Sequence, residues 1–134
     1  MYFYHMMVIC TILFDFGNVL IDIDIPGTKQ RLESYLREDI VLKDGAHLIT
    51  PLVHAYETGT IKTAQFIHGI LEYAKPGVNE MDIISAWNSM LIGIPFYRLS
   101  MLQMLKENFT LLLLSNTNAL HIDWVHASQG RSWH

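Results

Sequence analysis

The sequence predicts an α/β fold in which two parallel strands flank an inserted block of helices. Two short runs, 8–14 (VICTILF) and 109–114 (FTLLLL), have the length and the branched apolar side chains of strands buried on both faces. Pro, Gly and capping residues punctuate the long segment between them in the manner of helices. Length alone leaves a buried helix open for either run. A carboxylate, Asp15, ends the first run, and the ends of strands are where α/β proteins place their chemistry.

Composition restricts the class of protein. The chain has 134 residues, of which 51% are hydrophobic and 16% charged, enough for one domain with a core and too apolar for disorder. Its net charge is −4 and its nine Lys and Arg residues are scattered singly, which disfavours a nucleic-acid partner. The single cysteine, Cys10, rules out a disulfide framework and fits a reducing compartment.

The apolar segment 6–14 is interpreted as a strand rather than a targeting signal. No Lys or Arg precedes it, and no small-residue cleavage site follows before Asp15. No run approaches the ~18 apolar residues that a membrane span needs. We therefore expect a cytoplasmic protein without a membrane partner.

The elements follow in order along the chain. After the first strand, 21–25 (IDIDI) alternates with period two and stops at Pro26-Gly27, which predicts a half-exposed hairpin arm beside that strand. Helix starts are then predicted at Thr28 (to about Arg37), Thr50-Pro51, Thr60 to Thr63 (ending by Lys75-Pro76-Gly77), Asn79 (to about Leu91), Pro95 and Asn118.

Apolar periodicity predicts the buried faces of two of these helices. Ile84, Trp87, Met90 and Leu91 fall on one face of the helix that Asn79 caps, with Asp82 in its first turn. The stripe of the helix after Pro95 consists of Leu99, Met101, Leu102 and Leu105. The domain prediction is an α/β core of 1–25 and 90–134, with the helical block 26–89 inserted as a second module.

Two polar sites follow the predicted strands. Asp15 lies in LFDFGNVL, and an ionised carboxylate at the end of a buried run needs a cavity, a metal or a cluster of donors. Ser115-Asn116 follows four leucines. Simpler interpretations remain open, because Asp also favours turns and caps, and Ser-Asn is an ordinary strand-to-helix cap.

Three segments together, FDFGNVLIDID (14–24), AWNSMLIGIP (86–95) and LLLLSNTN (111–118), resemble the haloacid dehalogenase (HAD) superfamily of hydrolases, in the branch with a helical cap after the first strand. The resemblance spans about 9–125. It implies a partial Rossmann-like core of parallel strands with an inserted helical cap, and a hydrolase acting on a small phosphorylated metabolite.

The resemblance also implies roles for single residues. Asp15 would be the nucleophile that forms a covalent aspartyl intermediate, in the manner of covalent catalysis. The hydroxyl of Ser115, together with Phe16, Gly17 and Asn116, would hold the transferring phosphate. The Asp15 carboxylate and the Gly17 carbonyl would be ligands of Mg²⁺.

Two departures from the family pattern affect activity. Phosphatases of the superfamily usually carry an acid two residues after the nucleophile, where this sequence has Gly17. The Lys of a third motif and the acidic residues of a fourth do not follow Val125, so we expect a shortened member with weak or absent Mg²⁺ binding and no turnover by itself. Asp22 and Asp24 are not assigned the acid role. The alternative is a catalytically silent HAD-fold binding or interaction protein, and a helical interaction protein would require Asp15 and Ser115 to lie far apart.

Histidines and aromatic residues favour packing over metal binding. His121, Asp123 and His126 do not share one helix face. The other histidines and the aromatic residues of the inserted helical block are expected on its surface or in its core: His47, His54, His68, Tyr56, Phe66, Tyr73 and Trp87. A two-stranded parallel sheet with an unpaired edge is small and prone to pair with another chain, so a homo-oligomer is expected.

Overall fold

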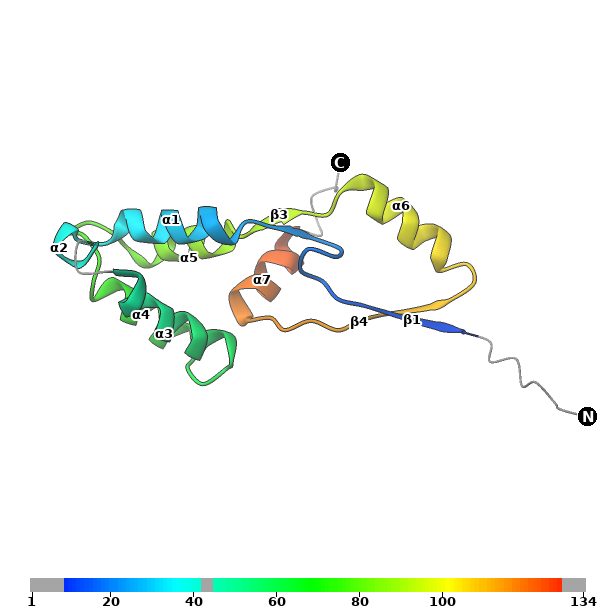
Figure 1. Cartoon of the computed structure of the whole chain (residues 1–134), viewed down its shortest axis with the longest axis horizontal. Coiled ribbons are helices and arrows are strands. Elements are labelled where there is room, and N and C mark those ends of the chain that lie inside the picture. Colours follow the sequence, from blue (N-terminus) through cyan, green and yellow to red (C-terminus); the bar gives the residue numbers. More distant parts are fainter. Residues whose placement is uncertain (1–8, 42–44, 129–134) are drawn as a thin grey trace, which may run out of the picture.

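The computed structural model describes residues 9–41 and 45–128 and has the mixed α/β architecture that the sequence predicts. The helices α1–α5, hereafter the helical module, lie at one end of the molecule, and β1, β4 and α6 lie at the other (Figure 1). The elements in chain order are β1 Thr11–Phe14, β2 Asp22–Ile23, α1 Ile25–Tyr35, α2 Glu38–Val41, α3 Gly45–Glu57, α4 Thr63–Leu71, α5 Glu80–Asn88, β3 Leu91–Gly93, α6 Phe96–Leu105, β4 Thr110–Leu113 and α7 Ala119–Ser128.

The two predicted strands pair in parallel, as expected. Thr11 is opposite Thr110 and Phe14 is opposite Leu113. Backbone hydrogen bonds extend the pairing at both ends, from Thr110 N to Cys10 O (2.8 Å) and from Leu114 N to Phe14 O (2.8 Å). Both strands therefore end at the same edge. Val8 and the residues before it lie outside the described part of the chain.

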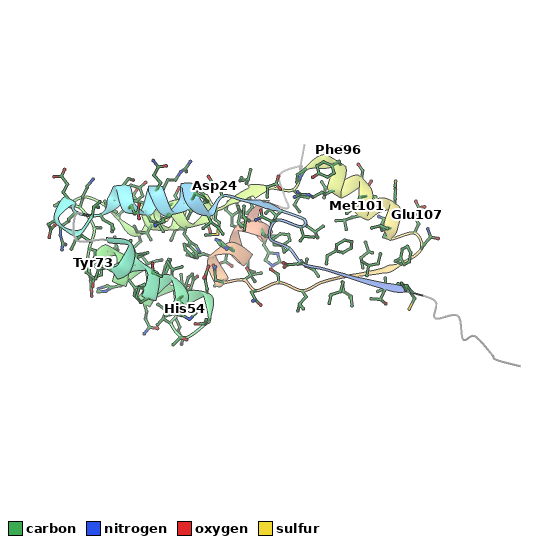
Figure 2. The ribbon with its side chains drawn as sticks, in the orientation of Figure 1. Asp24, His54, Tyr73, Phe96, Met101 and Glu107 are labelled. Atoms are coloured by element: carbon green, nitrogen blue, oxygen red, sulfur yellow. The ribbon has the colours of Figure 1, made fainter. Side chains whose placement is uncertain are left out.

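The prediction that both faces of this sheet are buried is wrong for the described structure. Leu13 is 57% exposed and Leu112 is 51% exposed. One helix, α6, runs along the pair (Figure 1), and its predicted stripe is at most half-buried. Leu99 and Leu102 line a hollow of about 360 Å³ between α6 and the strands. Figure 2 shows Phe96 and Met101 along the same helix.

The segment 21–25 does not form a hairpin arm beside the first strand. Asp22–Ile23 pairs antiparallel with Leu91–Gly93, a strand that the sequence assigned in part to the preceding helix. That helix ends at Asn88 because Leu91 is buried and pairs with Ile23 instead. The hydrogen bond from Asp24 N to Met90 O (2.9 Å) ties the chain before α1 to the chain after α5.

The first helix begins earlier than predicted. Asp24 is its N-cap and accepts a hydrogen bond from Gly27 N (2.9 Å), so Pro26 occupies the first turn instead of ending a strand (Figure 2). Thr28 is buried inside the helix and donates to Asp24 O (2.8 Å). A Pro in the first turn is tolerated because the N–H that it lacks would have no helical partner there.

Other helix starts differ in accuracy. Pro51 lies inside α3, which begins at Gly45, so the predicted start at Thr50-Pro51 is wrong. Asn79 caps α5 as predicted, accepting from the backbone N–H of Met81 and Asp82, while Asp82 accepts from Asn79 N (2.8 Å). The starts of α4, α6 and α7, at Thr63, Phe96 and Ala119, agree with prediction.

The hydrophobic core lies in the helical module. Tyr56 and Phe66 stack with ring centroids 4.4 Å apart, and Trp87 meets Phe66 edge-on at 4.9 Å. These three side chains are buried, which confirms their packing roles, and Tyr73 is partly buried against them. Within the described residues, none of the helices combines the length and the apolar character required to cross a membrane.

Candidate functional site

The parallel pairing of β1 and β4 brings Asp15 and Ser115 to one pocket. Each residue follows the end of its strand, and the two ends lie at the same edge of the sheet. The pocket has a volume of about 550 Å³, and its lining includes Asp15, Gly17, Ser115 and Asn116. The structure thus brings together four of the five predicted site residues. Phe16 lies outside this lining and contacts the neighbouring pocket.

The Asp15 carboxylate is exposed to the pocket rather than buried. Its Oδ1 accepts a hydrogen bond from the N–H of Phe16 at 2.7 Å. One carboxylate oxygen is therefore held by the backbone of the next residue. In the described structure no hydrogen bond is made by the other, Oδ2, which is free to approach a ligand in the pocket.

The chain turns back on itself directly after Asp15. The carbonyl oxygen of Phe16 accepts from both Leu20 N and Ile21 N (2.9 Å each), and Asn18 N donates to Ile21 O (2.7 Å). Asn18 has φ of 56°, the left-handed conformation that Asn tolerates better than most residues. Gly17 is not required by crowding, because a Cβ there would meet Ile23 Cδ1 at an ordinary 3.5 Å.

An ion pair fixes the far side of this turn. Arg98 on α6 contacts Asp22 Oδ1 at 2.6 Å and donates to Leu20 O at 3.2 Å. The hydrogen bond with Asp22 raises the pKa of Arg98. Asp22 is therefore a partner of Arg98, and Asp24 is a helix cap, consistent with neither being assigned the acid role. Sequence reasoning missed Arg98, because nothing near it in the chain indicates its distant partner.

The segment after β4 is attached to the helical module. Asn118 Oδ1 accepts from the N–H of His121 (3.1 Å) and from Trp87 Nε1 (3.3 Å). The hydroxyl of the half-buried Ser115 donates to Asn116 O (3.3 Å). The site between Ser115 and Asn118 is thus connected to α5 by a side-chain hydrogen bond.

His121 is a packing residue at this attachment. Its ring stacks on Trp87 with centroids 5.3 Å apart, and its Nε2 lies 3.4 Å from Trp87 O. Burial lowers the pKa of His121, although the bond to the Trp87 carbonyl opposes this. Asp123 and His126 are exposed, and the described residues contain no group of three or more His, Cys, Asp or Glu that could hold a metal.

The other histidines are on the surface or outside what can be described. His68 is exposed and lies 3.4 Å from Glu72. His54 is exposed near the end of α3 (Figure 2) and contributes to a second pocket, which sequence reasoning did not predict. The side chain of His47 lies outside the described residues.

The described residues supply few ligands for Mg²⁺. Among the described residues, Asp15 is the only carboxylate that lines the pocket. The Gly17 carbonyl, which no hydrogen bond of the described structure uses, could be a second ligand. Mg²⁺ requires near-octahedral oxygen coordination. These two groups alone do not form a magnesium site.

Comparison with known proteins identifies solved structures with a similar fold. The sequence matches no protein-family model and no curated protein. The solved structures that it resembles include the HAD family enzyme BT-2542 from Bacteroides thetaiotaomicron, with a TM-score of 0.74 and 36% identity over 87% of this chain and 58% of that one.

Two further structures extend this result. The wild-type BT-2542 complex with magnesium and inorganic phosphate has a TM-score of 0.73 and 34% identity, over 88% of this chain and 58% of that one. A predicted HAD-like family hydrolase from Porphyromonas gingivalis has a TM-score of 0.67 and 25% identity, over 86% of this chain and 55% of that one. The chain thus spans less than two thirds of the length of these proteins. It belongs to the HAD superfamily.

Proposed function

We propose that this chain carries the nucleophile and the phosphate pocket of a HAD-like phosphatase that acts on a small phosphorylated metabolite. The observation that carries the proposal is that the Asp15 carboxylate and Ser115 line one pocket at the ends of two paired parallel strands. A HAD family neighbour whose structure is a complex with magnesium and inorganic phosphate supports the substrate class.

The proposed reaction begins with attack of an Asp15 carboxylate oxygen on phosphorus. A P–O bond to the enzyme forms as the P–O bond to the substrate oxygen breaks. The substrate oxygen leaves with the bonding electron pair and takes a proton from water to give the alcohol. The hydroxyl of Ser115 and the side-chain amide of Asn116 donate hydrogen bonds to the transferring phosphoryl oxygens. Water then hydrolyses the aspartyl phosphate and releases inorganic phosphate.

The same pocket lacks groups that make such a reaction fast. Gly17 has no side chain to protonate the leaving oxygen, a contribution commonly worth a factor of ~10²–10⁴. The described lining contains no Lys or Arg and no second carboxylate to balance the charge of a phosphate. The proposal is therefore that the 134-residue chain binds phosphate weakly and does not turn over a phosphate ester by itself.

The second candidate, a catalytically silent HAD-fold binding protein, is favoured by the same lining. It differs from the first in what Asp15 does, because a binding protein needs no nucleophile. An aryl phosphate such as p-nitrophenyl phosphate with Mg²⁺ tests whether the chain is catalytically silent, with Asp15→Asn as the matched variant. We expect p-nitrophenol to be released at the background rate by both the unmodified chain and the variant. Mg²⁺-dependent turnover that is lost in Asp15→Asn would show that the chain is catalytically active and would identify Asp15 as the nucleophile.

Phosphate binding is tested separately from turnover. Inorganic phosphate should perturb the backbone N–H signals of Phe16, Gly17 and Asn116 in a nuclear magnetic resonance (NMR) titration. Ser115→Ala should weaken the binding severalfold, because it removes a hydroxyl donor from a charged ligand. The control is Ser100→Ala, whose hydroxyl on α6 donates to Phe96 O and lies outside the pocket lining. Equal affinity of the Ser115 variant and the unmodified chain would contradict the phosphate site.

A further inference from the structure

A second pocket continues the phosphate pocket toward the helical module. It has a volume of about 380 Å³ and shares Gly17, Ile23, Ser115 and Asn116 with the first. Its far wall comes from the end of α3, through His54 and Glu57, and from Thr58 directly after it. Because they share these residues, the two pockets form one groove, and a ligand held at Ser115 can extend along it toward α3.

A third pocket, of about 320 Å³, continues the groove into the helical module. It shares Ile25, Glu57 and Met90 with the second pocket and extends to Trp87. Apolar side chains form the larger part of its lining, from Ile25, Leu32, Ile49, Val53, Trp87 and Met90. The polar part consists of Thr28, Thr50, Glu57 and the ion pair of Lys29 with Glu33 at 3.8 Å. Ligand pockets of this kind use apolar walls with a few polar groups.

We propose that the groove binds a phosphate ester whose alcohol has an apolar body, with the phosphate at Ser115 and the apolar body in the third pocket. The inference rests on the proposed function and adds the chemical class of the leaving group. A polyol such as a sugar would lose hydrogen bonds to water against this wall, because Ile25, Val53 and Met90 have no hydrogen-bonding groups in their side chains. An apolar group would gain by leaving water.

Binding is measured on the full chain by NMR, with four probes: inorganic phosphate, 1-naphthyl phosphate, 1-naphthol and glucose 6-phosphate. The Val53 methyl signals report on the third pocket and the Asn116 N–H reports on the phosphate end. 1-Naphthyl phosphate should shift both signals and bind about tenfold more tightly than inorganic phosphate. Glucose 6-phosphate should bind no more tightly than inorganic phosphate, and 1-naphthol should shift the Val53 signals alone.

Ile25→Gln tests the wall with little risk to the fold. Ile25 lines both the second and the third pocket. Its side chain is 56% exposed at the start of α1, so a polar replacement is tolerated there. The variant should bind 1-naphthyl phosphate roughly three- to tenfold more weakly and inorganic phosphate equally well. The control is Met81→Gln, because Met81 is 68% exposed on α5 and lines neither pocket.

The outcomes separate this inference from the proposed function. If 1-naphthyl phosphate binds no better than inorganic phosphate or glucose 6-phosphate, or if Ile25→Gln has no effect, the leaving-group assignment is wrong while the phosphate site stands. If 1-naphthol binds but no phosphate does, the phosphate site and the ester assignment both fail. Absence of binding by all four probes overturns both.

Discussion

Replacing Trp87 with Phe should strongly destabilise the chain, because Trp87 joins the helical module to the segment after β4. The side chain is 1% exposed, and its ring contacts Phe66 at 4.9 Å and His121 at 5.3 Å. Phe keeps part of these contacts but loses the hydrogen bond to Asn118 Oδ1. The lost hydrogen bond contributes about 1 kcal/mol, and the smaller ring leaves a cavity costing roughly 1–2 kcal/mol. The free energy of unfolding should therefore fall by about 2–3 kcal/mol.

Urea unfolding followed by far-ultraviolet circular dichroism measures this change without depending on tryptophan emission. The midpoint should fall by about 1–2 M while the slope stays constant, since the surface exposed on unfolding hardly changes. Phe96→Leu is the control, because Phe96 is 72% exposed on α6 and its replacement should change stability by less than about 0.5 kcal/mol. A loss below about 0.5 kcal/mol for Trp87→Phe would show that the ring and its hydrogen bond do not hold the two parts together.

Four other outcomes follow from the described contacts. Burial lowers the pKa of His121, so the imidazole binds a proton more readily in the unfolded chain than in the folded one. The free energy of unfolding should therefore rise from about pH 5 to about pH 7 and fall as the pH drops below about 6.5. In urea titrations at several pH values, His121→Phe should flatten this rise. Asn79→Ala should cost about 1 kcal/mol in the same unfolding assay by removing the cap of α5, and an unchanged midpoint would contradict the cap. Gly17→Asp should unfold at a urea concentration close to that of the unmodified chain, because a Cβ at position 17 would meet Ile23 Cδ1 at an ordinary contact distance. The exposed faces of the β1–β4 pair should make the 15.4 kDa chain self-associate, whereas a single monomeric species across a sedimentation concentration series would refute this.

Much of the fold could be predicted where local sequence decides the structure. The apolar runs before Asp15 and Ser115 gave the parallel pair, and Asn79 with Asp82 gave a helix start, because strand hydrophobicity and capping act over a few residues. The β2–β3 pair could not be found this way. Leu91 has a helical spacing from Trp87, but its pairing with Ile23 depends on a partner far along the chain. The sequence predicts that Pro26 ends a strand. In the structure Pro26 belongs to a helix instead, because the Asp24 side chain accepts a hydrogen bond from Gly27 N and caps that helix.

The candidate site was predictable in part for the same reason. Asp15 and Ser115 could be expected together, since parallel strands bring their carboxyl ends to one edge. The exposure of the sheet faces does not follow from the apolar runs, which are typical of strands covered on both faces. It is expected only from the missing family motifs, because they leave no helices to cover the strands. Likewise, Arg98, His54 and Glu57 reach the turn or the groove only through tertiary packing.

The short β2–β3 ladder has a consequence for the order of folding. Pairing Thr11 with Thr110 requires closing a loop that contains most of the chain, which is entropically unfavourable and slow. Once Asp22 meets Gly93, the helical module is bridged at its base, and the loop still to be closed is shorter by roughly two thirds, lowering the closure cost by about 1 kcal/mol. The helical module, whose contacts are closer in sequence, is thus expected to form first, and the parallel strands join last. Stopped-flow refolding should then show Phe66→Leu slowing folding, while Leu112→Ala chiefly speeds unfolding.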